Sequence, residues 1–355
     1  MLIMKKIYLI CMIFSLILYY PVKAQFAPAA GEPGSTAIYK DSAVIQGWAA
    51  SCEVARGYIN IADTTVTYTQ GSTTSNKAFF GHDSLAIGSP GGTMDVVSLG
   101  DGGYAVLQFD NPITNGAGAD FAVFENGYQV PSPPYLYFLE LGFVEVSSDG
   151  INYVRFPAYS HTQDTAQVGG FDQLDPEDIH NLAGKYTADY GTPFDLEDLK
   201  DSTGVDINSI THVKIIDVNG NITDSLASYD SEGNKINDPW PTPYHSCGFD
   251  LDAVGVIHFA GKQSIYTINN KQEAIQVFPN PVTPEKPLSL HNNGTPVHYL
   301  SVSMLDFSGK TVCRHEPESG GQTPWRLPRN IKPGIYVLQV ITGESVNTVK
   351  IVVSR

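Results

Sequence analysis

Short runs of β-branched and aromatic residues, separated by turn-forming residues, recur along most of this chain and constrain its fold more than any other feature. Residues 147–150 (Ser-Ser-Asp-Gly) lie between two alternating runs, which is a hairpin signal. Segments this short cannot bury their apolar faces alone, so we expect an all-β fold of two packed sheets, a jelly-roll-like β-sandwich. The clearest strand candidates are 94–99, 104–109, 121–124, 141–147, 153–156, 213–218 and 253–259.

The stretch from residue 161 to 206 predicts a long, partly helical insertion between strands. Asp175 is a suitable N-cap, Pro176 suits the first helical turn, and Gly184 would end a helix formed by 179–183. Long ordered insertions commonly carry function, which directs attention to this segment.

The first 24 residues have the three parts of a secretory signal. Lys5 and Lys6 form a basic start, 7–20 is apolar, and Ala24 is a small residue at the cleavage position. The apolar stretch is shorter than the about 20 residues that a membrane-spanning helix needs. We therefore expect a signal peptide over 1–24, Sec export through the periplasm, and no transmembrane segment in the mature chain.

Charge divides the rest of the chain into two modules. The formal net charge of the whole chain is −16, which argues against nucleic-acid binding because phosphate contacts need a basic face. Residues 25–274 hold 32 acidic and 10 basic side chains, whereas 275–355 hold 5 acidic and 8 basic ones. This change of sign predicts an acidic β-sandwich domain over 25–260, a linker over 261–274 and a separate module over 275–355.

Three cysteines follow the signal segment. Cys52 lies near the start of the acidic module and Cys247 near its end, so a disulfide between them would join its two ends in an exported protein. The alternative is a pair of buried thiols. Cys313 is expected to fill a small apolar space in a strand.

Spaced motifs mark the C-terminal module. They are Phe-Pro-Asn-Pro at 278–281, Asp-Phe-Ser-Gly-Lys at 306–310, Pro-Gly-Ile-Tyr-Val at 333–337 and a closing Lys-Ile-Val-Val at 350–353. In this order they resemble the type A C-terminal sorting domain of type IX secretion cargo in Bacteroidota. The resemblance implies a small Ig-like β-sandwich, the type IX secretion machinery as partner, and a secreted or outer-membrane-surface location. An ordinary Ig-like accessory domain is the alternative.

Six Asp-Ser/Thr-X triplets lie in the acidic module. They resemble the O-glycosylation sequon of the same bacteria and would make the chain a glycoprotein, although Asp-Ser and Asp-Thr are also common turn pairs. The expected acceptors are Ser42, Thr64, Ser84, Thr165, Ser202 and Ser225.

The centre of the acidic module carries a second resemblance. The segments at 118–126, 145–150, 181–185, 191–196 and 249–254 resemble a family of bacterial cell-surface proteins of uncharacterised function. The likeness covers most of 80–258. It implies an extracellular β-domain and no particular reaction.

Loops and strand ends rich in carboxylates and amides predict a calcium site, because hard cations prefer several such oxygens. A solvated turn is the alternative for each loop. The candidate ligands are Asp120, Glu125, Asn126, Asp217, Asn219, Asp250 and Asp252.

Residues 238–245 predict an organic ligand site. Alternating prolines stiffen this loop, so Trp240, Tyr244 and His245 could present a platform for stacking on a sugar. The alternative is that these rings cap the end of the sandwich. The chain has no nucleophile elbow, metalloprotease motif or phosphate-binding loop.

Together these features predict a secreted or cell-surface, non-catalytic protein that binds a glycan or another small extracellular ligand and is stabilised by calcium. Two further classes stay open. A secreted hydrolase acting on polysaccharide could use the carboxylates of Asp250 and Asp252. A structural or adhesive surface protein would show no concave pocket and no aromatic platform, and a capture protein for an outer-membrane uptake receptor belongs to the same non-catalytic class.

Overall fold

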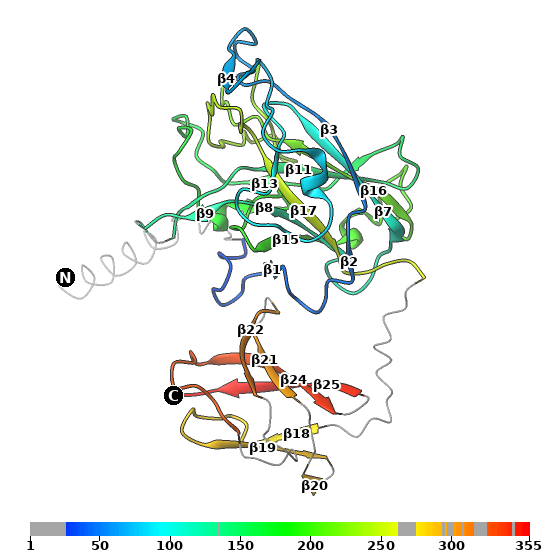
Figure 1. Cartoon of the computed structure of the whole chain (residues 1–355), viewed down its shortest axis with the longest axis vertical. Helices are drawn as coiled ribbons and strands as arrows, with labels where there is room; N and C mark the ends of the chain where they lie inside the picture. Colours follow the sequence, from blue (N-terminus) through cyan, green and yellow to red (C-terminus); the bar gives the residue numbers. More distant parts are fainter. Residues whose placement is uncertain are drawn as a thin grey trace, which may run out of the picture.

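The computed structural model describes residues 26–131, 133, 135–261, 275–292, 295–296, 301–306, 309–315, 325–342 and 345–355. The expected signal peptide and all of the expected linker after residue 261 lie outside these residues. The described residues form strands and three short 3-10 turns, with no α-helix among them, so the all-β expectation is confirmed (Figure 1).

Two sheets build the acidic module, and all strand pairs within them are antiparallel. The first has the order β1 (Ile38–Tyr39), β15 (Tyr190–Phe194), β8 (Phe121–Glu125), β17 (Asp250–Val256) and β2 (Gly47–Trp48), with β6 (Val97–Ser98) also paired to β17. The second has the order β12 (Val154–Arg155), β11 (Gly142–Ser147), β16 (Ile210–Asp217), β7 (Tyr104–Ile113) and β3 (Ser51–Ala55).

Shorter elements decorate this pair of sheets. Three two-stranded ribbons pair β4 (Tyr68–Gln70) with β5 (Thr73–Ser75), β9 (Tyr128–Gln129) with β10 (Tyr137–Phe138), and β13 (Tyr159–Ser160) with β14 (Ile179–His180). The 3-10 turns are η1 (Asp83–Ala86), η2 (Pro176–Asp178) and η3 (Leu196–Leu199).

The core lies between the two main sheets. Leu107 and Val213 point inward from the five-stranded sheet, and Phe121 and Val254 meet them from the six-stranded sheet; all four are buried. Alternation of buried and outward side chains along β7 and β16 follows from the pleat of a strand. The sequence runs therefore formed a two-sheet sandwich as expected.

Two details of the expected fold are wrong. The two main sheets have six and five strands, whereas a jelly roll has eight strands in total. The insertion over 161–206 is present, but its described residues contain no α-helix. Asp175 does cap a turn, accepting a hydrogen bond from the backbone N–H of Glu177 at 3.0 Å, but the turn ends after three residues. Ile179 then pairs with Ser160 as a strand, so sheet pairing replaces the helix.

The insertion covers part of the outer face of the five-stranded sheet. Phe143 and Ile216 are cross-strand neighbours in β11 and β16, and they pack with Val168, Leu174 and Ile179 of the insertion. The insertion leaves the rest of this face uncovered. There, Glu53 of β3 and residues of β7 line a groove.

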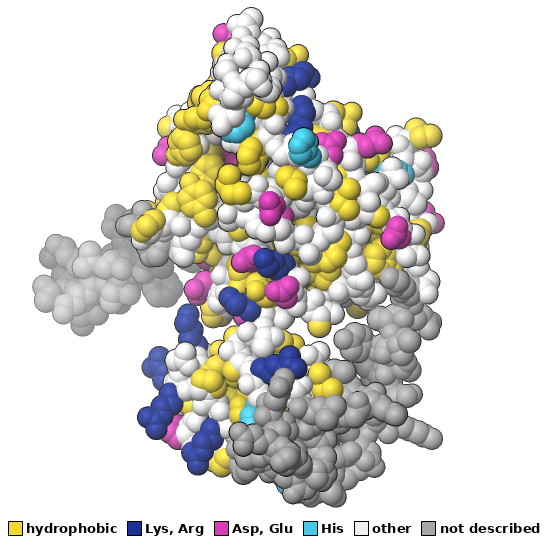
Figure 2. Space-filling model, in the orientation of Figure 1, with side chains coloured by type: hydrophobic (Ala, Val, Ile, Leu, Met, Phe, Trp, Pro, Cys, Tyr) yellow, Lys and Arg dark blue, Asp and Glu magenta, His cyan; other side chains and the backbone are white. Residues whose placement is uncertain are grey.

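The C-terminal module is a second, smaller β-sandwich. Its core includes Val277, Leu290, Val302, Leu338 and Ile351. One sheet contains β18 (Ile275–Phe278), β19 (Pro287–Asn292), β20 (Thr295–Pro296) and β23 (Trp325–Arg326). The other has the order β22 (Thr311–His315), β21 (Ser301–Leu305), β24 (Gly334–Thr342) and β25 (Ser345–Val353). Lysine and arginine side chains gather on the face of this module seen in Figure 2.

Candidate functional site

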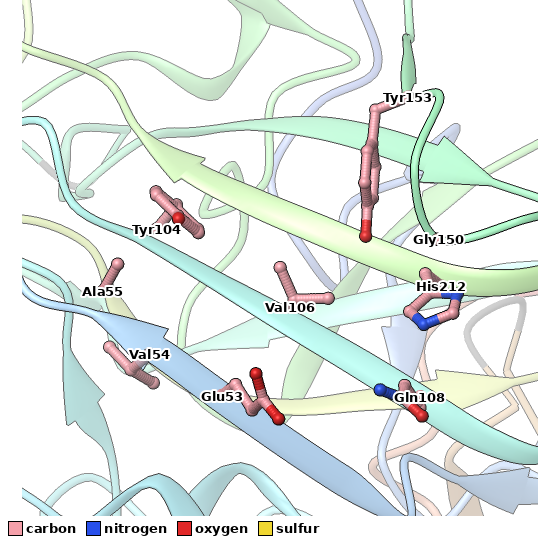
Figure 3. Close-up of a pocket in the computed structure, with 9 residues that line it drawn as sticks. All are labelled: Glu53, Val54, Ala55, Tyr104, Val106, Gln108, Gly150, Tyr153 and His212. Carbon is pink, nitrogen blue, oxygen red and sulfur yellow. The ribbon is translucent and has the colours of Figure 1, made fainter.

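An open groove of about 370 Å³ runs across the outer face of the five-stranded sheet. Figure 3 shows its side chains standing on neighbouring strands, with Tyr153 reaching in from the hairpin loop beside Gly150. The groove combines two phenol rings with polar side chains that can form hydrogen bonds. Its main lining residues are Glu53, Tyr104, Gln108, Gly150, Tyr153 and His212.

Strand register places these side chains together. Glu53 of β3 lies opposite Val106 of β7, and Gln108 of β7 lies opposite His212 of β16. Alternate residues of a strand share one face, so Tyr104 joins Val106 and Gln108 in the groove. The His212 ring is oriented by a 2.8 Å hydrogen bond between its Nδ1 and the hydroxyl of Thr211.

The β11–β12 hairpin positions Tyr153. The Asp149 carboxylate accepts hydrogen bonds from the backbone N–H groups of Ile151 and Asn152, both at 2.8 Å, and these bonds lower the pKa of Asp149. Gly150 has a φ of +74°, and a Cβ there would lie 2.8 Å from the His212 ring. A glycine is therefore required at this turn for the hairpin to fold close over the sheet.

A lysine fixes the two tyrosine rings. The Nζ of Lys214 lies 4.7 Å from the ring centroid of Tyr104 and 5.3 Å from that of Tyr153. Its charge is also 3.5 Å from a carboxylate oxygen of Glu145 on the next strand. Since cation–π contacts favour one ring orientation, the groove is largely pre-formed.

A second cavity, here called the end pocket, has a volume of about 430 Å³ and aromatic walls. The rings of Tyr128 and Phe138 stack with centroids 5.1 Å apart, and Phe171 contacts Tyr244 at 5.7 Å. Two carboxyl side chains, Glu140 and Asp250, also line this pocket.

Buried carboxyl groups gather at and behind the end pocket. Desolvation by burial raises the pKa of Glu125, Glu140, Asp217 and Asp238 well above their usual values, and mutual repulsion raises each of them further. Burial raises the pKa of Asp250 to about 7. We call these five residues the acid cluster.

Hydrogen bonds satisfy the acid cluster only in part. The hydroxyl of Ser98 and the amide of Asn126 donate to Asp250, the latter at 3.1 Å. The backbone N–H groups of Phe249 and Gly102 donate to Asp217 at 2.7 and 3.1 Å.

Two oxygens of the acid cluster stay unsatisfied. Glu125 Oε1 and Asp238 Oδ1 are buried and have no hydrogen-bond partner among the described residues. Such groups are costly in a protein interior. The described part of the chain contains no group of three or more His, Cys, Asp or Glu side chains placed to hold a metal ion.

The structure brings some of the expected metal ligands together and separates others. Glu125, Asn126, Asp217 and Asp250 lie in or beside the acid cluster. The other three have local structural partners. Asp120 contacts His258 Nδ1 at 2.6 Å, Asp252 accepts from the N–H of Gly91 at 3.1 Å, and the Asn219 amide donates to the carbonyl of Leu226 at 2.7 Å.

The structure also separates the three residues of the expected ligand platform, Trp240, Tyr244 and His245. Tyr244 lines the end pocket, but the indole N–H of Trp240 donates to Asp101 Oδ2 at 3.0 Å and His245 stacks on Tyr68 with centroids 5.3 Å apart. Phe171, which also lines the end pocket, lies in the expected insertion over 161–206, ahead of the expected helix. Sequence reasoning also missed Tyr104 and Tyr153 as parts of one groove.

The expected Cys52–Cys247 disulfide is absent from the structure, in which both thiols are free and buried. Cys52 packs in the main core, whereas Cys247 packs with Ile59 and Ala78 in a separate cluster. Burial raises the pKa of the Cys52 thiol to about 12, so it stays protonated.

The expected glycosylation acceptors differ in accessibility. Thr64, Ser84, Thr165 and Ser225 are exposed, and Ser202 is half-buried. Ser42 is only 5% exposed and lies against Gly309 of the C-terminal module, so it is a poor acceptor in this structure.

No helix in the described residues is long and apolar enough to cross a membrane. No curated protein matches the chain. A solved structure titled "Biofilm associated protein - BSP domain" is similar at a TM-score of 0.18 and 10% sequence identity. That similarity covers 71% of this chain, which spans 48% of the other one.

One family model matches the C-terminal module. Residues 276–354 match the family described as "Secretion system C-terminal sorting domain". The match agrees with the motifs at 278–281, 306–310 and 333–337 and with the small sandwich that they form. Residues 276–354 are therefore a type IX C-terminal sorting domain, which marks the chain as a secreted or cell-surface protein.

Proposed function

We propose that this protein is a non-catalytic, extracellular ligand-binding protein. Its groove on the outer face of the five-stranded sheet, here called the outer-sheet groove, binds a glycan. The observation that carries the proposal is that one open groove contains both polar side chains and two tyrosine rings, which Lys214 contacts. The apolar face of a sugar can stack on Tyr104 and Tyr153, while Glu53, Gln108 and His212 offer hydrogen bonds to its hydroxyls.

The groove also suits an extended ligand. It lies on the surface of a sheet, where successive sugar units could follow the strand direction. The sorting domain supports the proposal, because a protein delivered outside the cell meets polysaccharides there.

Replacing Tyr153 by alanine should weaken glycan binding about tenfold, or roughly 1.4 kcal/mol, because one stacking surface is lost. A glycan array finds the ligand, and calorimetry on the best glycan measures the change. Ile151→Ala is the matched control, since Ile151 lies in the same hairpin, is 81% exposed and does not line the groove. An array without any bound glycan, or equal affinity of wild type and Tyr153→Ala, would contradict the proposal.

Calcium stabilisation stays a prediction from the oxygen-rich loops and strand ends. No three His, Cys, Asp or Glu side chains of the described residues are placed to hold a metal ion, and the unsatisfied buried oxygen of Glu125 is the feature that favours a cation there. If calcium binds there, a chelator should lower the melting temperature by about 5 °C, since a ligand of the folded state stabilises it. Glu125→Gln should remove this difference, whereas the same change at the exposed Glu232 should keep it. Identical melting with calcium and with chelator would exclude calcium stabilisation.

A further inference from the structure

The end pocket shares no lining residue with the outer-sheet groove, and its chemistry is different. The groove is lined mostly by polar side chains, whereas the end pocket has four aromatic rings around two carboxyl groups. The six residues that matter are Tyr128, Phe138, Phe171, Tyr244, Glu140 and Asp250.

We propose that the end pocket is a second binding site, and that it binds a small organic cation carrying an alkylammonium or quaternary ammonium group. Aromatic faces attract such a cation through their negative quadrupole, and they tolerate its apolar methyl or methylene groups. Carboxyl groups at the same cavity supply the opposite charge when the cation binds and favours their ionised form.

The aromatic wall is continuous. Phe138 stacks on Tyr128 at 5.1 Å and lies 6.4 Å from Phe171, which in turn lies 5.7 Å from Tyr244. Three of these rings are more than one-third exposed, with Phe171 at 63%. They come from the β9–β10 ribbon and from two loops remote in sequence, so the fold brings them together around the cavity.

The carboxyl groups of the pocket have no matching cation in the lining, which contains no lysine or arginine among the described residues. Arg56 is the cation that acts on Asp250, but its guanidinium donates to the backbone carbonyls of Phe80 and Gly81, both at 2.7 Å. Behind the pocket, Glu125 is 1% exposed and its Oε1 has no partner among the described residues. A cation in the pocket would reduce the repulsion that these acids exert on one another.

The aromatic walls of the end pocket favour an organic cation over a metal ion. A bare metal ion binds through several oxygen ligands and gains little from aromatic faces. An alkylammonium ion is stabilised by the carboxyl groups and by the rings together, because its charge faces Glu140 and Asp250 while its carbon groups contact the aromatic side chains.

Choline and its neutral isostere 3,3-dimethyl-1-butanol test this proposal directly. The two molecules have nearly the same shape and differ in charge. Calorimetry on the purified protein with a chelator present should show choline binding about tenfold or more tighter than the isostere, from the cation–π and carboxylate interactions. Equal affinity for both, or no binding of choline, would overturn the proposal.

Variants assign the binding to this pocket. Phe171→Ala removes an exposed ring with little risk to folding and should weaken choline binding about fivefold to tenfold. Glu140→Gln should also weaken it while leaving the isostere unaffected. Tyr135→Ala is the matched control, because Tyr135 is 61% exposed and does not line the pocket. Choline affinity unchanged in Phe171→Ala and Glu140→Gln, both verified as folded by their melting curves, would place the binding elsewhere and refute the assignment.

Discussion

The unliganded protein should lose stability as the pH rises from about 4 to about 7, which is the reverse of ordinary acid denaturation. The acid cluster is the cause. Each of its carboxyls has a pKa in the folded state above its unfolded value, so the folded state holds protons that the unfolded state has already released. The stabilising contribution of such a group is complete below the unfolded pKa and is lost as the pH rises through the folded pKa.

Asp250 gives the scale of this effect. Its pKa rises from 3.8 to about 7 on folding. The difference corresponds to about 4 kcal/mol that the folded state loses between these two pH values. Asp250 is buried against Ser98 and Asn126, so water screens the effect little.

Urea unfolding at a series of pH values measures this dependence. Asp250→Asn removes the ionisable group but keeps the side-chain shape, so its stability should fall less steeply with pH and exceed that of wild type near pH 8. Asp110→Asn, at an exposed position, should behave as wild type. A free energy of unfolding that stays level or increases between pH 5 and pH 7 in wild type would show that the acid cluster is not desolvated as described.

Local patterns in the sequence predicted local structure well. The turn at 147–150 forms the expected hairpin because Asp149 and Gly150 satisfy the backbone and permit its positive φ. The expected helix failed for a non-local reason. Asp175 and Pro176 did start a turn, but the pairing of Ile179 with Ser160, 19 positions earlier in the chain, ended it.

The sites were harder to predict because they depend on register and burial. The groove joins Glu53, Tyr104 and His212 from three strands that are paired across long stretches of sequence. The sequence of a single strand does not show which distant strand it will pair with.

The acid cluster did leave one signal. Glu140 lies within the apolar run 136–143, where an acidic residue must be buried or must break the strand pattern. The burial of Asp238 could not be predicted in this way, since an aspartate before a proline is typical of an ordinary exposed turn.

The sorting domain supports the central claim, which is that the acidic module works outside the cell. Its core, which includes Val302 and Leu338, is separate from the core of the acidic module. Removal of residues 276–354 should therefore leave the acidic module folded while removing the part that the secretion machinery recognises.

Quantifying the acidic module outside the cell, with and without residues 276–354, tests this claim most directly. Deletion of residues 276–354 should retain nearly all of the protein inside the cell envelope. Full-length Tyr153→Ala, which keeps the sorting domain, should be exported as wild type. Undiminished amounts of the shortened protein outside the cell would show that residues 276–354 are not what delivers the acidic module there.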